Sequence, residues 1–111
     1  MARKKIYTEY KLPASVVAMV RVVCVDYVRR DRALRWDMLT VGVKMEFERL
    51  NRAVDGAVIG INADARGEFI KDIGIQRGYD FSPCSIYFAK NTYYARKRKA
   101  IYDIAVSLNL V

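Results

Sequence analysis

Apolar residues recur at helical spacing along most of the chain. The first such stripe consists of Val16, Val20, Val23 and Tyr27. Intervals of four, three and four residues place these side chains on one face of an α-helix. Pro13 suits the first turn of that helix, because its missing N–H would have no intrahelical partner there. The pattern predicts a first helix over about residues 13–33, although its many valines also favour a strand.

Two further helices are predicted in the middle of the chain. The second stripe consists of Val43, Phe47, Leu50, Val54 and Val58. It predicts a helix over about residues 37–59, which Gly56 and Gly60 weaken or end. Asn62 or Asp64 can cap a third helix. The expected buried side of this third helix consists of Ala65, Phe69 and Ile73, and its expected end is at Gly74 and Gly78.

Residues 81–111 predict a short helix, a tight turn and a long helix. Ser82 followed by Pro83 suits the N-cap and first position of a helix that ends near Ala89. Residues 90–92 then form the turn, and Asn91 or Thr92 caps a final helix over about 92–108. The apolar side of this helix would carry Tyr94, Ile101, Ile104, Ala105 and Leu108, and the opposite side Thr92, Arg96, Lys99 and Asp103.

The whole pattern predicts an all-α protein, a small helical bundle ending in a C-terminal helix-turn-helix. A length of 111 residues suits one domain. Within it we distinguish a basic arm at 1–12, a helical body at 13–80 and the helix-turn-helix at 81–111. Cys24 and Trp36 are expected to pack in the interior, with Cys24 acting as a small buried hydrophobe.

Positive charge is concentrated at the two ends of the chain. Twenty lysines and arginines against twelve acidic residues leave a net charge of +8. Residues 1–35 carry nine basic and three acidic side chains, residues 36–80 six and eight, and residues 81–111 five and one. Separated basic segments favour a polyanionic partner, because each phosphate contact releases condensed counterions. The plain alternative is that the excess charge only aids solubility.

Composition argues against several enzyme classes. The absence of histidine removes imidazole base catalysis, and two isolated cysteines cannot alone form a four-ligand metal site. No glycine-rich phosphate loop occurs. Asp64, Glu68 and Asp72 share a helical face that could hold Mg²⁺, but such rows are more often solvated surface. We therefore expect no enzymatic activity, no cofactor and no metal.

The cellular setting expected from the sequence is the cytoplasm. No apolar stretch is long enough to cross a membrane, and the basic start is not followed by the apolar core of a signal peptide. Two isolated cysteines suit a reducing compartment.

The predicted last helix begins with a dense cluster of cations. The cluster is the run Arg96, Lys97, Arg98 and Lys99, preceded by Lys90. The helix macrodipole does not favour cations in the first half of a helix, whereas an external anion would relieve their mutual repulsion. Duplex DNA is the expected partner, with this helix in the major groove. The alternative is a solvated basic face.

Each residue of the cluster has an expected role. Thr92, Tyr93 and Arg96 are the candidate base or groove contacts, since arginine pairs bidentately with guanine. The candidate phosphate contacts are Lys90, Lys97, Arg98 and Lys99, and Asn91 belongs to the same surface. Tyr94 and Tyr102 are expected to pack. Arg3, Lys4 and Lys5 would add an arm contact.

The same segment resembles a known family. Residues 91–101 (NTYYARKRKAI) followed by 104–110 (IAVSLNL) are similar to the closing segment of the ArpU/RinA-type phage transcriptional regulators. Residues 10–13 and 21–27 resemble the family's first helix more loosely. Asn91 stands where serine is usual, and Asn109 replaces the customary glycine, which asparagine can still match in a left-handed C-cap. The resemblance implies a sigma-factor-region-4-like helix-turn-helix and a phage or prophage transcription regulator in a bacterial host.

A protein-interaction module is the alternative function. The long apolar stripes of the first two predicted helices exceed what one small core needs, so two chains could pair as a homodimer. The same surface could instead bind host RNA polymerase, as the sigma-like resemblance suggests. No membrane partner is expected.

Overall fold

The computed structural model describes residues 11–36 and 38–111, and every regular element in that part of the chain is helical. The elements are α2 (Ala14–Val25), α3 (Tyr27–Trp36), α4 (Val41–Ala57), α5 (Ala63–Ile75), the 3₁₀ helices η1 (Tyr79–Phe81) and η2 (Pro83–Ile86), and α6 (Lys90–Ser107). The all-α prediction is confirmed. The predicted contact of Arg3, Lys4 and Lys5 lies outside the described residues.

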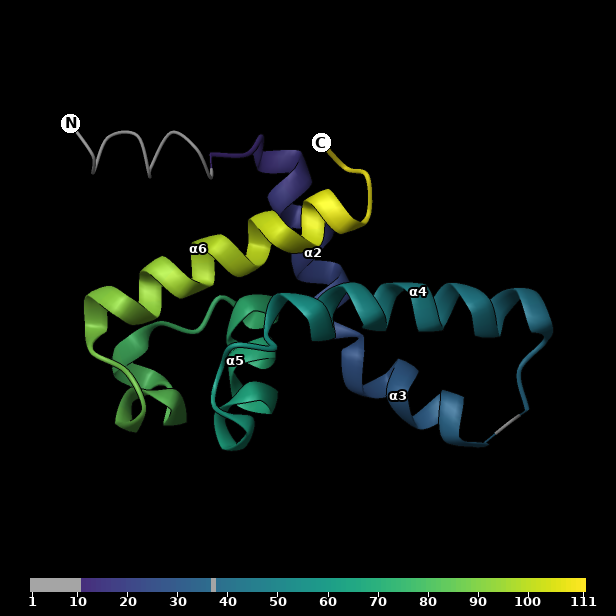
Figure 1. The fold of residues 1–111 in the computed structure, drawn as a ribbon, viewed down its shortest axis with the longest axis horizontal. Coiled ribbons are helices and arrows are strands. Elements are labelled where there is room, and N and C mark those ends of the chain that lie inside the picture. Colours follow the sequence, from purple (N-terminus) through teal and green to yellow (C-terminus); the bar gives the residue numbers. More distant parts are fainter. Residues whose placement is uncertain (1–10, 37) are drawn as a thin grey trace.

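The helices form an elongated arrangement measuring 50 × 31 × 21 Å (Figure 1). Helix α6 packs across α4 and α2, while α5 packs against α2. Helices α3 and α4 lie side by side and extend away from the other helices as a pair. No helix in the described part of the chain is long and apolar enough to span a membrane.

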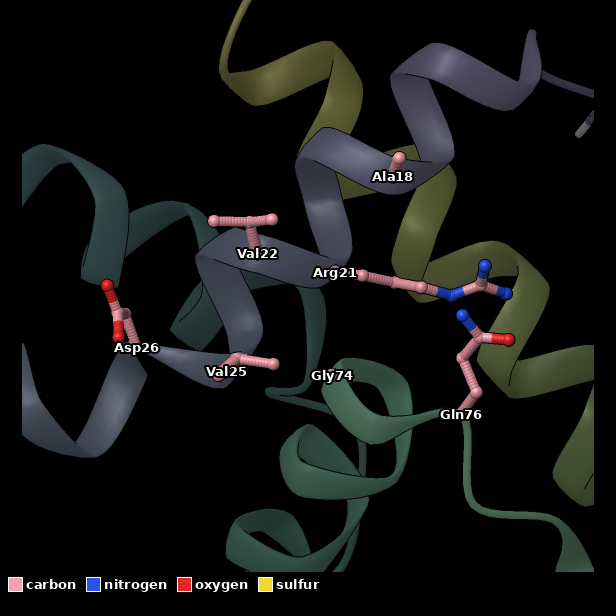
Figure 2. Close-up of a pocket in the computed structure, with 7 residues that line it drawn as sticks. All are labelled: Ala18, Arg21, Val22, Val25, Asp26, Gly74 and Gln76. Carbon is pink, nitrogen blue, oxygen red and sulfur yellow. The ribbon is translucent and has the colours of Figure 1, made fainter.

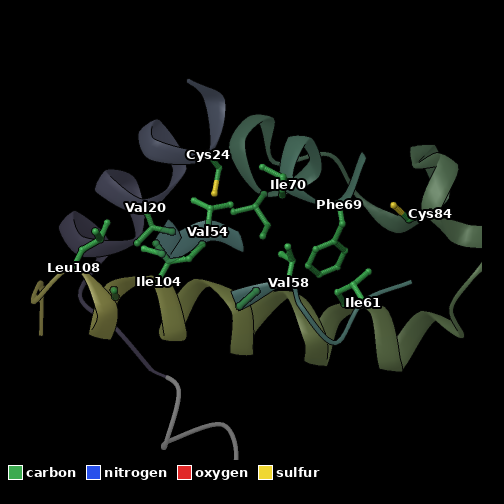
Figure 3. Packing of buried hydrophobic residues seen from close by; sticks show 14 of the residues in the cluster. Val20, Cys24, Val54, Val58, Ile61, Phe69, Ile70, Cys84, Ile104 and Leu108 are labelled. Atoms are coloured by element: carbon green, nitrogen blue, oxygen red, sulfur yellow. The ribbon is translucent and has the colours of Figure 1, made fainter. Parts of the chain in front are cut away.

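One core joins α2, α4, α5 and α6 (Figure 3). Its most deeply buried aliphatic members include Val20, Val54, Val58, Ile73 and Ile104. Cys24 lies in this core with 3% of its surface exposed, which confirms its predicted role as a small buried hydrophobe. Removal of this apolar surface from water is the main favourable contribution to such a fold.

The predicted first helix is broken at Asp26, so the expectation of one continuous helix over 13–33 is wrong. Arg30 is buried at the bend, where its Nη2 donates to the carbonyl of Val23 and its Nε donates to Asn51 Oδ1 at 2.6 Å. Asn51 Nδ2 in turn donates to the carbonyl of Tyr27 at 3.2 Å. Side chains thus satisfy backbone carbonyls that face the bend, as buried polar groups require.

Helix α4 begins later than predicted. Thr40 is its N-cap and accepts from the backbone N–H of Val43 at 3.4 Å. Only the C-terminal half of the apolar stripe reaches the core, because the first half belongs to the projecting α3–α4 pair. Val43 is 41% exposed, and Trp36 is 73% exposed. The prediction that Trp36 packs in the interior is therefore wrong.

Helix α5 has the predicted start and buried side but a different end. Asn62 caps it by accepting from the N–H of Asp64 at 2.9 Å. It ends at Gln76, which is left-handed with φ of 59°. Gly74 lies inside the helix, where a Cβ would come within 2.9 Å of the Val25 backbone nitrogen. Gly74 permits α2 and α5 to cross at short distance (Figure 2) and does not end α5.

Candidate nucleic-acid interface

The segment expected to form a helix-turn-helix has a different local structure. Ser82 is an N-cap as predicted and accepts from the N–H of Cys84 at 3.0 Å, but η2 is a four-residue 3₁₀ helix. Helix α6 begins at Lys90, with Ala89 at its N-cap and no side-chain cap. Asn91 and Thr92 therefore lie within the first turn of α6, and the prediction that one of them caps it is wrong. The segment has one α-helix and not two.

The C-terminal end of α6 has the predicted cap. Asn109 has a φ of 58°, and Leu110 N–H donates to the carbonyl of Ala105 at 2.9 Å. This is the Schellman arrangement, in which a left-handed residue turns the chain back over the helix end. The cap and the burial of Leu108 fix the end of α6 against the core.

Tyr93 is fully buried and cannot contact a base. Its hydroxyl donates to Asp72 Oδ2 at 2.7 Å and lies 3.1 Å from the carbonyl oxygen of Arg77. Four aromatic rings surround it, those of Phe69, Tyr79, Phe88 and Tyr94. The prediction that Tyr93 reads DNA is wrong, because the tyrosine expected on the surface attaches α6 to α5.

Lys97 is also directed toward the protein. Its Nζ donates to the carbonyl of Arg77 at 2.7 Å and lies 5.1 Å from the centre of the Tyr93 ring. Burial lowers the pKa of Lys97, and the charges of Arg21 and Arg77 act in the same direction while Asp72 opposes them. The half-buried ammonium is thus already hydrogen bonded to the protein, which removes it from the outer face of α6.

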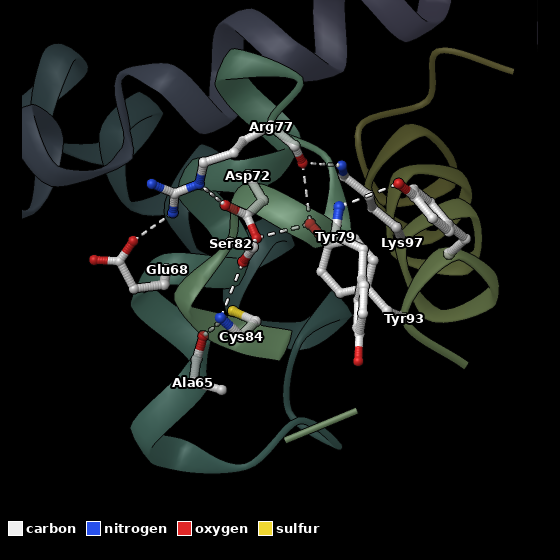
Figure 4. Close-up of polar contacts among 10 residues, drawn as sticks. Ala65, Glu68, Asp72, Arg77, Tyr79, Ser82, Cys84, Tyr93 and Lys97 are labelled. Atoms are coloured by element: carbon white, nitrogen blue, oxygen red, sulfur yellow. Dashed lines mark hydrogen bonds and ion pairs between the residues drawn. The ribbon is translucent and has the colours of Figure 1, made fainter. Parts of the chain in front are cut away.

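A buried carboxylate organises this side of the molecule (Figure 4). Asp72 is wholly inaccessible to solvent and accepts from Arg77 Nε at 2.5 Å, from the Tyr93 hydroxyl and from the Ser82 hydroxyl. Arg77 also pairs with Glu68, with 2.5 Å between Nη2 and Oε2. Hydrogen bonds to charged groups are the stronger ones. This network ties α5, η2 and α6 into fixed relative positions.

Sequence reasoning missed this network. The row Asp64, Glu68 and Asp72 is not a uniformly solvated surface, since Asp72 is buried and Glu68 is paired with Arg77. The available signal was an acid in the buried register of α5, one residue before Ile73 and three after Phe69. Within the described residues, no cluster of three or more acidic or cysteine side chains is placed to hold a metal ion.

The exposed part of the predicted interface lies on the outer face of α6. Asn91, Thr92, Arg96 and Lys99 are exposed or partly exposed, and Arg98 is half-buried. Lys99 Nζ pairs with Asp103 at 2.7 Å, and at the helix start Lys90 Nζ lies 3.4 Å from Asp80 Oδ2. Arg96 makes no ion pair with any carboxylate in residues 11–36 and 38–111. It is therefore the cation on this face whose charge is least compensated.

Arg96 and Lys99 border a small hollow between α6 and the end of α4. Its volume is about 200 Å³, and Gly56 and Gly60 form its opposite side. A Cβ on Gly60 would lie 3.5 Å from Arg96 Nη1, so the guanidinium passes close over this turn. Asp103 also lines the hollow. Because Asp103 pairs with Lys99, Arg96 supplies the cation of this hollow that no carboxylate in the described residues pairs with.

The two cysteines are buried away from this face. Burial raises the pKa of the Cys24 thiol to about 12 and also raises the pKa of the Cys84 thiol. Both are therefore protonated at neutral pH, which makes them poor nucleophiles.

Comparison with known proteins identified no relative. No family model, no curated protein and no solved structure matches the chain. The resemblance to the ArpU/RinA-type regulators stays a prediction.

Proposed function

We propose that this protein is a non-enzymatic, sequence-specific DNA-binding protein that contacts duplex DNA with the outer face of α6. In this proposal α6 enters the major groove, which is wide enough to admit one α-helix. Arg96 and Thr92 contact base edges, while Lys90, Arg98 and Lys99 contact phosphates. Asn91 lies beside them on the exposed first turn. Tyr93 and Lys97 take no part and instead fix the orientation of α6.

The observation that carries the proposal is the exposed, uncompensated charge of Arg96 on a helix rich in cations. Helix α6 contains five basic residues and one acidic residue. A carboxylate partner would have cancelled the charge of Arg96, but the described part of the chain provides none. An arginine fork in this position matches either a guanine edge or a phosphate.

The two ion pairs on the same helix do not oppose DNA binding. The side chains of Lys90 and Asp80 are 57% and 67% exposed, and that of Lys99 is 53% exposed. Ion pairs between exposed side chains contribute about 0–1 kcal/mol. A DNA phosphate can therefore replace either carboxylate at small cost, and release of counterions from the DNA favours the exchange.

The resemblance of residues 91–110 to the ArpU/RinA-type regulators adds a biological setting to the proposal. It suggests transcription regulation in a bacterial cell that carries a phage or prophage, with η2 and the start of α6 standing in place of the family's helix-turn-helix.

Fluorescence anisotropy with a labelled duplex, over a series of salt concentrations, tests the proposal. The preferred sequence is first selected from a random duplex library. Binding should weaken steeply with salt, and Arg96→Ala should cost about 1–3 kcal/mol of binding energy on the selected duplex. Lys99→Ala should lower the magnitude of the salt slope by about one unit.

Arg32→Ala is the matched control, because Arg32 is an exposed arginine with no ion pair within the described residues. It belongs to α3, a helix that extends away from α6 (Figure 1). The substitution should leave both affinity and salt slope near their wild-type values. Equal effects of Arg32→Ala and Arg96→Ala would mean that only net charge matters, which contradicts the proposed interface. Absence of salt-sensitive binding to any duplex would refute the function itself.

Protein binding is the second candidate function, favoured by exposed apolar side chains on the α3–α4 pair and on the connection between these helices. Trp36, Met38, Val41 and Met45 are 73%, 84%, 77% and 66% exposed. Host RNA polymerase is the partner that the sigma-like resemblance suggests. If this is the function, the double substitution Arg96→Ala with Lys99→Ala should leave polymerase binding intact.

A further inference from the structure

The outward face of α5 contains a glycine that the fold of the single chain does not need. Gly67 lies in the middle of the helix and has no atom within 4 Å of the place where a Cβ would be. Glycine is disfavoured relative to alanine inside a helix. At Gly74 the neighbouring α2 backbone explains the glycine, but nothing in the described chain explains Gly67. Close approach by another chain would do so, and because Gly42 and Gly56 are equally open, it is the surface around Gly67 that distinguishes this position.

Opposite charges flank Gly67 on the same face. Asp64 precedes it by three residues and Lys71 follows it by four, and both side chains are exposed. Neither makes an ion pair within the described residues. Seven helical residues span about 10.5 Å along the axis, which is too far for these two side chains to pair with each other.

Exposed apolar side chains surround this face. Val25, Val28 and Ile75 are 56%, 55% and 52% exposed. Together with Asp64, Gly67 and Lys71 they line a hollow of about 540 Å³ between α5 and the bend joining α2 to α3. A second hollow of about 320 Å³ adjoins it at Val25 and continues past Val22 (Figure 2). Contiguous exposed apolar surface of this kind marks an interaction site.

We propose that a second copy of this chain occupies this face, with the two α5 helices packed antiparallel about a two-fold axis next to Gly67. In an antiparallel pair centred between residues 67 and 68, position 64 of one helix faces position 71 of the other. Asp64 of each copy then pairs with Lys71 of the other. The proposal is independent of DNA binding.

Charge complementarity selects a second copy over another partner. A two-fold interface uses the same patch on both subunits, so it requires a patch that complements itself. The exchange of Asp64 and Lys71 about the axis meets that requirement. Glu68, which lies nearest the axis together with Gly67, is already paired with Arg77 and so adds little repulsion. The valines flanking α5 then lose their contact with water at the same interface.

Sedimentation equilibrium of the full chain without DNA, over a range of protein concentrations, tests the proposal. The wild-type chain should dimerise. Gly67→Gln should abolish the dimer, because a long side chain blocks the close approach of the helices. It should not lower the thermal stability of the monomer, since the position is open there. Gly42→Gln is the matched control at a second helical glycine with no neighbour within 4 Å, and it should leave the dimer intact.

A charge-reversal cycle tests the register of the two helices. Asp64→Lys and Lys71→Asp should each weaken dimerisation by about tenfold or more, because each places like charges opposite one another twice in the dimer. The double variant should restore the wild-type affinity. Restoration cannot arise within one chain, because the two positions are two turns apart. A monomeric wild type, a dimer insensitive to Gly67→Gln, or a double variant as weak as the single ones would each overturn the proposal.

Discussion

Replacement of Asp72 by alanine is expected to destabilise the protein strongly without changing its surface. The carboxylate is fully buried and accepts hydrogen bonds from Arg77, Tyr93 and Ser82. Removal of one member of a buried charge pair costs about 3–5 kcal/mol, because the other charge is left without a partner.

The structure places Asp72→Ala at the lower end of that range. Arg77 keeps its ion pair with Glu68, and its side chain is 20% exposed, so water can solvate part of the guanidinium. The Tyr93 hydroxyl keeps the Arg77 carbonyl as an acceptor at 3.1 Å. We therefore expect a loss of about 3 kcal/mol, which corresponds to a fall of about 12 °C in Tm at about 4 °C per kcal/mol.

Urea denaturation followed by far-UV circular dichroism measures this loss. Asp80→Asn is the control, because Asp80 is 67% exposed and its ion pair with Lys90 spans 3.4 Å, so its loss should cost at most about 1 kcal/mol. Tyr93→Phe should cost about 1–2 kcal/mol, and its effect should be smaller in the Asp72→Ala background than in the wild type. Additive effects, or a loss below about 1 kcal/mol for Asp72→Ala, would refute the view that this network attaches α6 to α5.

Two further predictions concern the core. Gly74→Ala should destabilise the protein by about 1–3 kcal/mol, since its Cβ would meet the Val25 backbone. Gly42→Ala, at a position in open space, should be neutral or stabilising by up to about 1 kcal/mol. Equal effects of the two substitutions in urea denaturation would contradict the close crossing of α2 and α5. The pKa of Cys24 is raised from 9.0 to about 12, so the unfolded chain binds fewer protons than the folded chain between these values. Stability should therefore fall between pH 9 and 12, by about 1.4 kcal/mol per pH unit from this thiol. Cys24→Ala should make the free energy of unfolding fall less steeply between about pH 9 and 10. Above about pH 10, two tyrosines with raised pKa values also lower the free energy of unfolding as the pH rises. An unchanged slope in the variant would rule out the contribution of the thiol.

Local signals predicted local structure well. The stripe Ala65, Phe69 and Ile73 marked the buried face of α5, and Asn62 is one of the two residues predicted to cap its start. Asn109 marked the left-handed end of α6. These features depend on side-chain periodicity and on hydrogen bonds between residues close in sequence, so they can be recognised without knowledge of the fold.

The errors occurred where distant segments meet. Arg30, for which no sequence pattern made a prediction, is buried because Asn51 and the carbonyl of Val23 accept its hydrogen bonds. Tyr93 stands beside the cations of α6, yet it faces inward because Asp72 accepts a hydrogen bond from its hydroxyl. Trp36 looked like a core residue but lies on the α3–α4 pair, which extends beyond the core.

By itself, the sequence determined that the chain is helical, that cations gather on α6, and where a few helices begin or end, as at the start of α5 and the end of α6. Only the tertiary structure decided which of those cations reach solvent without a carboxylate, and which tyrosine is buried. The physical reason is that periodicity defines a face of a helix, whereas the partner of a polar group is supplied by another helix. Arg96 remains available to a ligand because no other helix in the described part of the chain supplies a carboxylate for it. Tyr93 is unavailable because Asp72 of α5 accepts a hydrogen bond from its hydroxyl.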